Sequence, residues 1–116
     1  MAKFDNDVGH SVPQFNAAVD DDPGILVQTG NTLLYGYDIL NGEAAVSYLQ
    51  LFDAAALTDV TLGTTVPDYV IGNAASVSTA RSLCKPLYFD LGLCIFSTTT
   101  STGNTGASQD VSFEYA

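Results

Sequence analysis

Hydrophobic and polar residues alternate with a period of two along several short stretches of this chain. Over residues 32–40 every second residue is a large apolar or aromatic one, and over 110–115 apolar residues alternate with acidic residues and a serine. Successive side chains of an extended chain point to opposite faces, so these stretches predict strands with one buried face. Residues 46–52 and 91–99 are largely apolar on both faces, which predicts strands inside a sheet.

Turn residues separate these stretches from weaker strand patterns. Further strands are predicted at 25–29, 66–71 and 76–83, the last one at the edge of a sheet. Loops are predicted at 54–65, which is expected to cross from one sheet to the other, and at 100–108, which is rich in Gly, Ser and Thr.

Asn41-Gly42 is the strongest hairpin signal in the chain. A two-residue type I′ turn needs positive φ at both central residues, which this dipeptide tolerates. It predicts that residues 44–52 form the antiparallel neighbour of the strand at 32–40, with Tyr35 near Tyr48 as a cross-strand pair.

The count and spacing of these elements predict the fold class. Seven or eight short strands at intervals of about ten residues, with no helical segment of similar length, are typical of all-β proteins. We therefore predict a two-sheet antiparallel β-sandwich, jelly-roll-like, in a domain that spans residues 24–116.

Residues 1–23 lack a sustained period and are predicted to form an extended N-terminal arm, which ends at the turn cluster Asp20–Gly24. The arm has a possible helical turn at 13–19. It is expected to pack on its own domain or on a neighbouring subunit, and a free terminus is the alternative. The residues predicted to bind a partner are the apolar ones: Phe4, Val8, Phe15 and Val19.

Charge limits the partners that the protein can bind. Thirteen acidic residues against three basic ones give a formal net charge of −10. Such a chain lacks the basic surface that binds nucleic acid or anionic lipid, and it is attracted to basic surfaces. Only 14% of residues are charged and 47% are hydrophobic. This suits contact with protein, although Ser, Thr, Asn and Gly could simply solvate the surface.

Few residues are suited to catalysis or metal binding. His10 is the only histidine, and neither a Gly-x-Ser-x-Gly elbow nor a phosphate-binding loop is present. We predict no catalytic residue, no metal site and no cofactor. Four carboxylates could approach one another at a sheet end as a catalytic pair: Asp53, Asp59, Asp68 and Asp90. The acidic turn Asp20 to Asp22 could hold Ca²⁺. For both groups a structural or solvated role is the alternative. Asp53 and Asp68 are expected to accept hydrogen bonds from loop backbone.

The cysteines and the apolar runs bear on the compartment. Cys84 and Cys94 lack Cys-x-x-Cys spacing, and we expect buried thiols made in reducing cytosol, with a single disulfide as the alternative. No signal peptide and no 18-residue apolar run is readable, so no membrane partner is predicted.

Three sequence segments carry a resemblance to a known group of proteins. They are Tyr48-Leu-Gln-Leu-Phe-Asp53, Thr61-Leu-Gly-Thr-Thr-Val-Pro-Asp68, and a glycine-led strand that ends in Ser97-Thr-Thr-Thr100. Over roughly residues 31–116 the chain resembles small all-β structural proteins of tailed bacteriophages. Some of these decorate or cement capsids, and others belong to tails or fibres.

The resemblance implies a non-enzymatic virion protein, made in the host cytoplasm, that binds the outer capsid surface as a decoration or cement protein. Its partners would be the major capsid protein or another virion protein, and it would form a homo-oligomer, a trimer or a dimer. The predicted inter-subunit contacts are tyrosines: Tyr35, Tyr37, Tyr48 and Tyr115. The alternative is a tail-fibre or baseplate-associated module that binds a receptor or carbohydrate, for which the lack of Trp is unfavourable.

Overall fold

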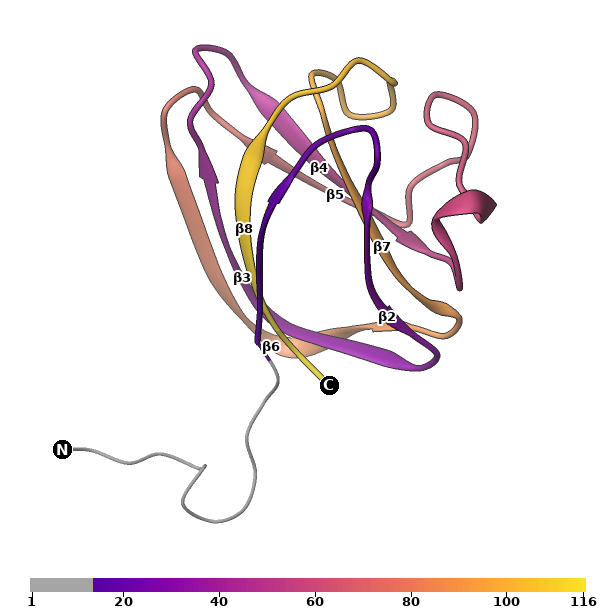
Figure 1. Ribbon diagram of the computed structural model, residues 1–116. Coiled ribbons are helices and arrows are strands. Elements are labelled where there is room, and N and C mark those ends of the chain that lie inside the picture. Colours follow the sequence, from indigo (N-terminus) through magenta and orange to yellow (C-terminus); the bar gives the residue numbers. More distant parts are fainter. Residues whose placement is uncertain (1–13) are drawn as a thin grey trace, which may run out of the picture.

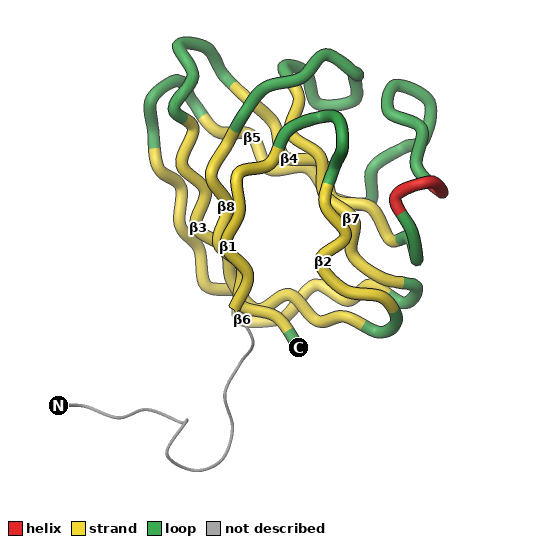
Figure 2. The backbone as a smooth tube through the Cα atoms, in the orientation of Figure 1, coloured by secondary structure: helices red, strands yellow, loops and turns green. Residues whose placement is uncertain are grey.

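Eight strands alternate between two antiparallel sheets in the computed structural model, which describes residues 14–116 (Figures 1 and 2). The strands are β1 (Gln14–Val19), β2 (Ile25–Thr29), β3 (Thr32–Asn41), β4 (Ser47–Asp53), β5 (Tyr69–Asn73), β6 (Ser78–Phe89), β7 (Gly92–Thr98) and β8 (Gln109–Tyr115), with a 3₁₀ helix at Leu57–Asp59. The predicted two-sheet sandwich is confirmed.

The first sheet has the strand order β1-β8-β3-β6, and the second has the order β2-β7-β4-β5. The first four strands pair in reverse order with the last four: β1 with β8, β2 with β7, β3 with β6 and β4 with β5. The chain therefore crosses between the sheets at almost every connection (Figure 1).

Two predicted connections are wrong. β3 and β4 do not form a hairpin, because they lie in different sheets, and Tyr35 is therefore not paired with Tyr48. Asn41 is buried, and its side chain organises a crossing instead: its Nδ2 donates to the carbonyls of Ala45 (2.9 Å) and Asn73 (3.0 Å). The segment after β4 was expected to cross between sheets, yet β4 and β5 are neighbours in the same sheet.

The start of the sandwich differs from the prediction as well. Gln14–Val19 pairs with β8 along its whole length, so this part of the expected arm is a strand and not a helical turn. The Asp20–Gly24 cluster is the turn that joins β1 to β2. The sandwich thus includes residues 14–23, which the sequence had assigned to the arm.

The main core lies between the two sheets. Buried apolar residues fill it, such as Leu34 and Ile39 of β3 and Val111 and Phe113 of β8, all at most 2% exposed. The predicted alternation of β8 is confirmed, since Asp110 and Glu114 are exposed.

A second, smaller core lies on the outer face of the second sheet. Phe52 and Phe96 meet edge-to-face there with ring centroids 5.6 Å apart, beside buried Cys94. Side chains of the β4–β5 loop, Leu57 and Leu62 among them, pack over these rings. Because both faces are covered, β7 is buried at all seven positions, as the sequence predicted for the central strands.

No helix among residues 14–116 has the length and apolar character needed to cross a membrane.

Candidate functional site

The outer face of the first sheet, unlike that of the second, is not covered by any of the described loops. Strand register places the outward residues of β1, β8, β3 and β6 in three rows across the sheet. We call this surface the open face. Its residues are Glu114, Gly36 and Ser82 in one row, Asn16, Ser112, Asp38 and Ala80 in the next, and Ala18, Asp110, Leu40 and Ser78 in the third.

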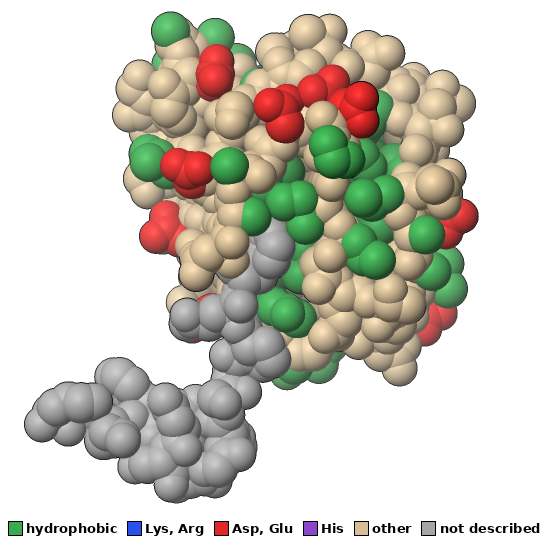
Figure 3. Space-filling view, in the orientation of Figure 1, with side chains coloured by type: hydrophobic (Ala, Val, Ile, Leu, Met, Phe, Trp, Pro, Cys, Tyr) green, Lys and Arg blue, Asp and Glu red, His purple; other side chains and the backbone are tan. Residues whose placement is uncertain are grey.

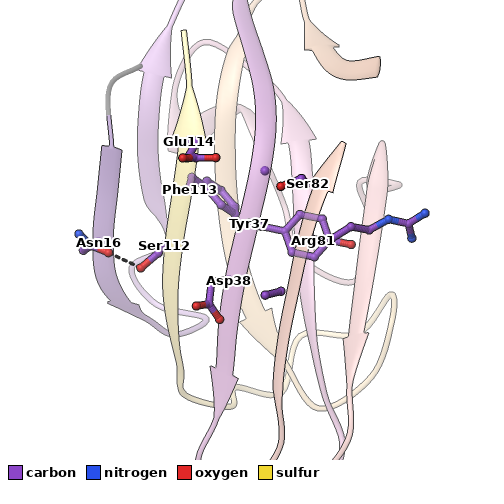
Figure 4. A pocket seen from close by; sticks show the side chains of 10 residues that line it. Asn16, Tyr37, Asp38, Arg81, Ser82, Ser112, Phe113 and Glu114 are labelled. Carbon is purple, nitrogen blue, oxygen red and sulfur yellow. Dashed lines mark hydrogen bonds between the residues drawn. The ribbon is translucent and has the colours of Figure 1, made fainter. Parts of the chain in front are cut away.

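Two shallow hollows run along the open face, with volumes of about 380 and 450 Å³. Both are lined by Asn16, Asp38 and Ser112, so they are adjacent, and we call the two hollows together the trough. Small residues make its floor: a Cβ added at Gly36 would lie 3.1 Å from the Arg81 carbonyl oxygen. Figure 4 shows the first hollow with the side chains of Asp38 and Glu114 on it.

Three carboxylates give the open face a negative potential. Asp38, Asp110 and Glu114 come from the neighbouring strands β3 and β8. Ser78 Oγ donates to Asp38 Oδ1 at 3.2 Å, and the Ser112 hydroxyl donates to the Asn16 side-chain oxygen. Arg81 contributes backbone to the first hollow, but its guanidinium points away from the Asp38 and Glu114 carboxylates in the view of Figure 4.

Arg81 instead belongs to the side of the sandwich between β5 and β6. Burial is the largest cause that raises the pKa of Tyr37, and the neighbouring Tyr69 raises it further. A hydrogen bond with Arg81 lowers this pKa. Tyr37 is only 7% exposed and packs in the main core. This side of the sandwich is therefore closed by a polar cluster of two tyrosines and an arginine.

A third hollow, of about 460 Å³, lies between the β1–β2 turn and the β4–β5 loop. Asp21 and Asp22 form its acidic rim, and Leu57, Leu62 and Phe96 its apolar wall. A hydrogen bond with Asp20 raises the pKa of Asp21, with a smaller contribution from burial. Among the residues that the structure describes, no group of three His, Cys, Asp or Glu is placed to hold a metal ion.

Asp53 and Asp68 act on backbone, as predicted. The Asp53 carboxylate accepts from the amides of Leu91 (2.7 Å) and Asp90 (3.1 Å), and Asp68 accepts from the amide of Asp53 at 2.7 Å. These bonds hold the β6–β7 turn and the start of β5 against the end of β4.

The two cysteines are free and differ in environment. Cys94 is fully buried, and burial raises the pKa of its thiol to about 11. Cys84 is exposed on β6, so the expectation of a buried thiol is wrong for this residue.

The residues predicted to contact partners lie in different places. Val19 is fully buried and Tyr37 nearly so, and both pack in the main core. Tyr35, Tyr48 and Tyr115 are half-buried on three different strands. Phe4, Val8 and the side chain of Phe15 lie outside the described residues.

The open face was missed at the sequence level. The sequence predicts that Asp110, Ser112 and Glu114 face water, but nothing in it places Asp38 beside them. That juxtaposition depends on the pairing of β3 with β8, strands about seventy residues apart along the chain.

Comparison of the chain with protein-family models, with curated proteins and with solved structures finds no match.

Proposed function

We propose that this protein is a non-enzymatic structural protein of a tailed-phage particle, which stabilises the shell by binding its outer surface as a decoration or cement protein. The observation that carries the proposal is the open face: an entire sheet surface with a shallow trough, three carboxylates and small side chains between them. Such a surface is suited to a broad, flat contact with protein, and its charge favours a basic partner surface.

The strand order supports the same proposal. The first strand pairs with the last, the second with the seventh, the third with the sixth and the fourth with the fifth, all antiparallel, and this pairing supports a jelly roll. We therefore propose a jelly roll as the finer description of the sandwich. Viral capsid domains and lectins are among the proteins built this way, so the fold supports a virion role without selecting it.

The trough offers little for catalysis, which is why the proposal assigns no reaction. It is a shallow groove on a sheet surface, whereas catalytic groups usually lie in clefts that exclude water. The described part of the chain holds no histidine. Cys94 is buried and lines none of the three hollows, although Phe96, which packs beside it, lines the third.

Cryo-electron microscopy of purified particles from the phage or prophage that carries the gene tests the location. We expect density for the sandwich on the outside of the shell, with the open face toward the shell protein. Particles that lack the chain, or that carry it only at the tail, would contradict the proposal.

A pair of matched variants tests the surface. Asp110 lies on the open face, and Asp59 lies on the exposed loop over the other sheet. Asp110→Asn should weaken co-sedimentation of the chain with heads that lack it, and Asp59→Asn should not, although both remove one negative charge. Equal weakening by both would point to net charge alone, and no weakening by either would remove the open face from the contact.

The second candidate is a carbohydrate- or receptor-binding module. The observation in its favour is the first hollow, whose volume of about 380 Å³ and lining of Asn16, Asp38, Ser82 and Glu114 would suit a sugar. Against it, the two aromatic residues that line the hollow, Tyr37 and Phe113, are buried and offer no face for stacking. Binding on a glycan array that Asp38→Asn abolishes, together with absence from the shell, would favour this candidate.

A further inference from the structure

The four strands at the edges of the two sheets differ in how they are protected from pairing with another chain. An edge strand presents unpaired backbone N–H and C=O groups, and proteins usually block it with Pro, Lys, a bulge or short length. The edge strands here are β1 and β6 in the first sheet and β2 and β5 in the second.

Two of the four edges carry such a device, and a third strand is short. In β6 the register passes from Gly36↔Ser82 to Leu34↔Leu87, so residues 83–86, including Lys85 and Pro86, bulge opposite Tyr35. The pairing of β2 with β7 shifts between Leu26 and Gln28. β5 has only five residues.

β1, which has six residues and directly follows Pro13 in the sequence, carries neither a bulge nor a register shift. It pairs with β8 in unbroken register over Gln14–Val19 and contains neither a charged residue nor a proline. No described segment other than β8 pairs with it. Asn16 and Ala18, the outward residues whose side chains are described, are exposed and small enough to admit a close neighbour.

The side of the sandwich next to β1 is also apolar. Ile25 and Val27 of β2 pack against the main core yet remain half-buried, and Leu26 is 38% exposed. Figure 3 shows hydrophobic side chains gathered between β1 and β2, and none of the described residues visible on this face is Lys or Arg. The opposite side, between β5 and β6, is closed by Tyr37, Tyr69 and Arg81. The undistorted edge of β1 therefore lies beside the side of the core that the described residues cover less.

We propose that two copies of this chain associate through β1, antiparallel to each other, so that their first sheets join into one continuous sheet. A two-fold axis perpendicular to the sheet near Ala17 places residues of the same face opposite each other and makes the contact self-complementary. The joined sheets would also unite the two open faces into one larger surface. This goes beyond the proposed function, because it names the surface of self-association and holds for the protein in solution.

The charges of the chain allow this arrangement and disfavour the parallel one. The carboxylates on β8 of the two copies would be separated by three strand spacings, about 14 Å, which exceeds the screening length of about 8 Å at physiological salt. Antiparallel pairing puts the two Asp20–Asp22 turns at opposite ends of the paired strands, whereas parallel pairing would stack them. A net charge of −10 still opposes association. We therefore expect a dimer that strengthens with salt.

Sedimentation equilibrium of the full chain over a wide range of concentration tests the proposal. Ala18 and Ala80 are matched exposed alanines on the same sheet face, one on each edge strand. We expect a dimer for the unmodified chain and for Ala80→Lys, and a shift to monomer, by at least tenfold in the dissociation constant, for Ala18→Lys. Asn16→Lys, at the neighbouring outward position, is the second variant should Ala18→Lys lose its circular dichroism spectrum.

Hydrogen exchange locates the contact independently of the variants. Amides of residues 14–19 should exchange more slowly as the concentration rises, and those of β6 should not change. A monomer at every concentration, a dimer that Ala80→Lys breaks and Ala18→Lys does not, or protection confined to β6 would overturn the proposal. None of these results depends on whether the protein binds a phage shell.

Discussion

The two sheets of this sandwich share one core and differ in their outer faces. The second sheet is covered by the β4–β5 loop, with Phe52 and Phe96 beneath it, and β7 is buried on both sides. The first sheet leaves its outer face open, with carboxylates and small residues along a shallow trough. The covered sheet therefore contributes a second buried core, whereas the open sheet carries the surface that we propose as the contact.

The two thiols sharpen this comparison most, because one lies on each sheet. Cys84 is exposed and Cys94 is fully buried. A thiol reagent should modify Cys84 rapidly, because this thiol is exposed. If Cys94 reacts only through unfolding, which costs at least about 5 kcal/mol in a typical domain, its reaction should be slower by a factor of several thousand or more. The measurement is the time course of labelling in native buffer, with Cys84→Ser as the control that removes the fast phase. Two equally fast thiols would mean that the second sheet is not closed.

Removal of a ring beneath the β4–β5 loop should have the next largest effect. Phe52 is 1% exposed, so Phe52→Ala leaves a cavity and loses the contact with Phe96. We expect a loss of about 3 to 5 kcal/mol in the free energy of unfolding, measured by urea denaturation. Leu40→Ala on the open face is the control, since Leu40 is 46% exposed, and it should cost about 0.5 kcal/mol or less. Similar losses for the two variants would break the comparison.

Alkaline pH should weaken the fold in part through Cys94, in the covered sheet. Burial raises the pKa of the Cys94 thiol from its ordinary value of 9.0 to about 11. The unfolded chain therefore loses this proton at a lower pH than the folded chain does, and its ionisation favours unfolding. The stabilisation is complete below pH 9 and falls between pH 9 and 11, by on the order of 2 to 3 kcal/mol. Urea titrations should show this decline for the unmodified chain and a shallower one for Cys94→Ala. Parallel pH profiles would mean that Cys94 ionises freely in the folded protein.

Substitution of a single carboxylate on the open face should have the smallest effect on stability. Asp110→Asn removes one negative charge from a surface where three lie on adjacent strands. We expect a gain of a few tenths of a kcal/mol at most, lost in high salt, because like charges at an exposed surface repel only weakly. The melting temperature at low and high salt measures it. A large loss of stability would show that Asp110 has a structural role and would remove it from the proposed contact surface.

The strands of this protein could be predicted from its sequence, but most of their partners could not. Alternation located β3 and β8, and two apolar faces identified β4 and β7 as central strands. Those signals are local. Asn41-Gly42 also looked local, as a hairpin turn, yet the Asn41 side chain binds the Asn73 carbonyl of the other sheet and guides a crossing.

The open face could not be predicted for the same reason. It is assembled from β1, β8, β3 and β6, which are not consecutive in the chain, and its trough exists only once these strands are ordered. β1 itself was assigned to an arm, because six uncharged residues next to a proline have too short a pattern to predict a strand. Its regularity becomes visible only in the pairing with β8.

The pairing of Gln14 with Glu114 brings the beginning and the end of the sandwich to the same corner (Figure 1). A peptide or fluorescent tag fused after Ala116 would consequently emerge next to residue 14, and a short linker would suffice to tether one end to the other in a permuted chain. In a two-fold dimer through β1 these ends of the two copies would lie at opposite ends of the paired strands, so each dimer could carry two fused tags that stay apart.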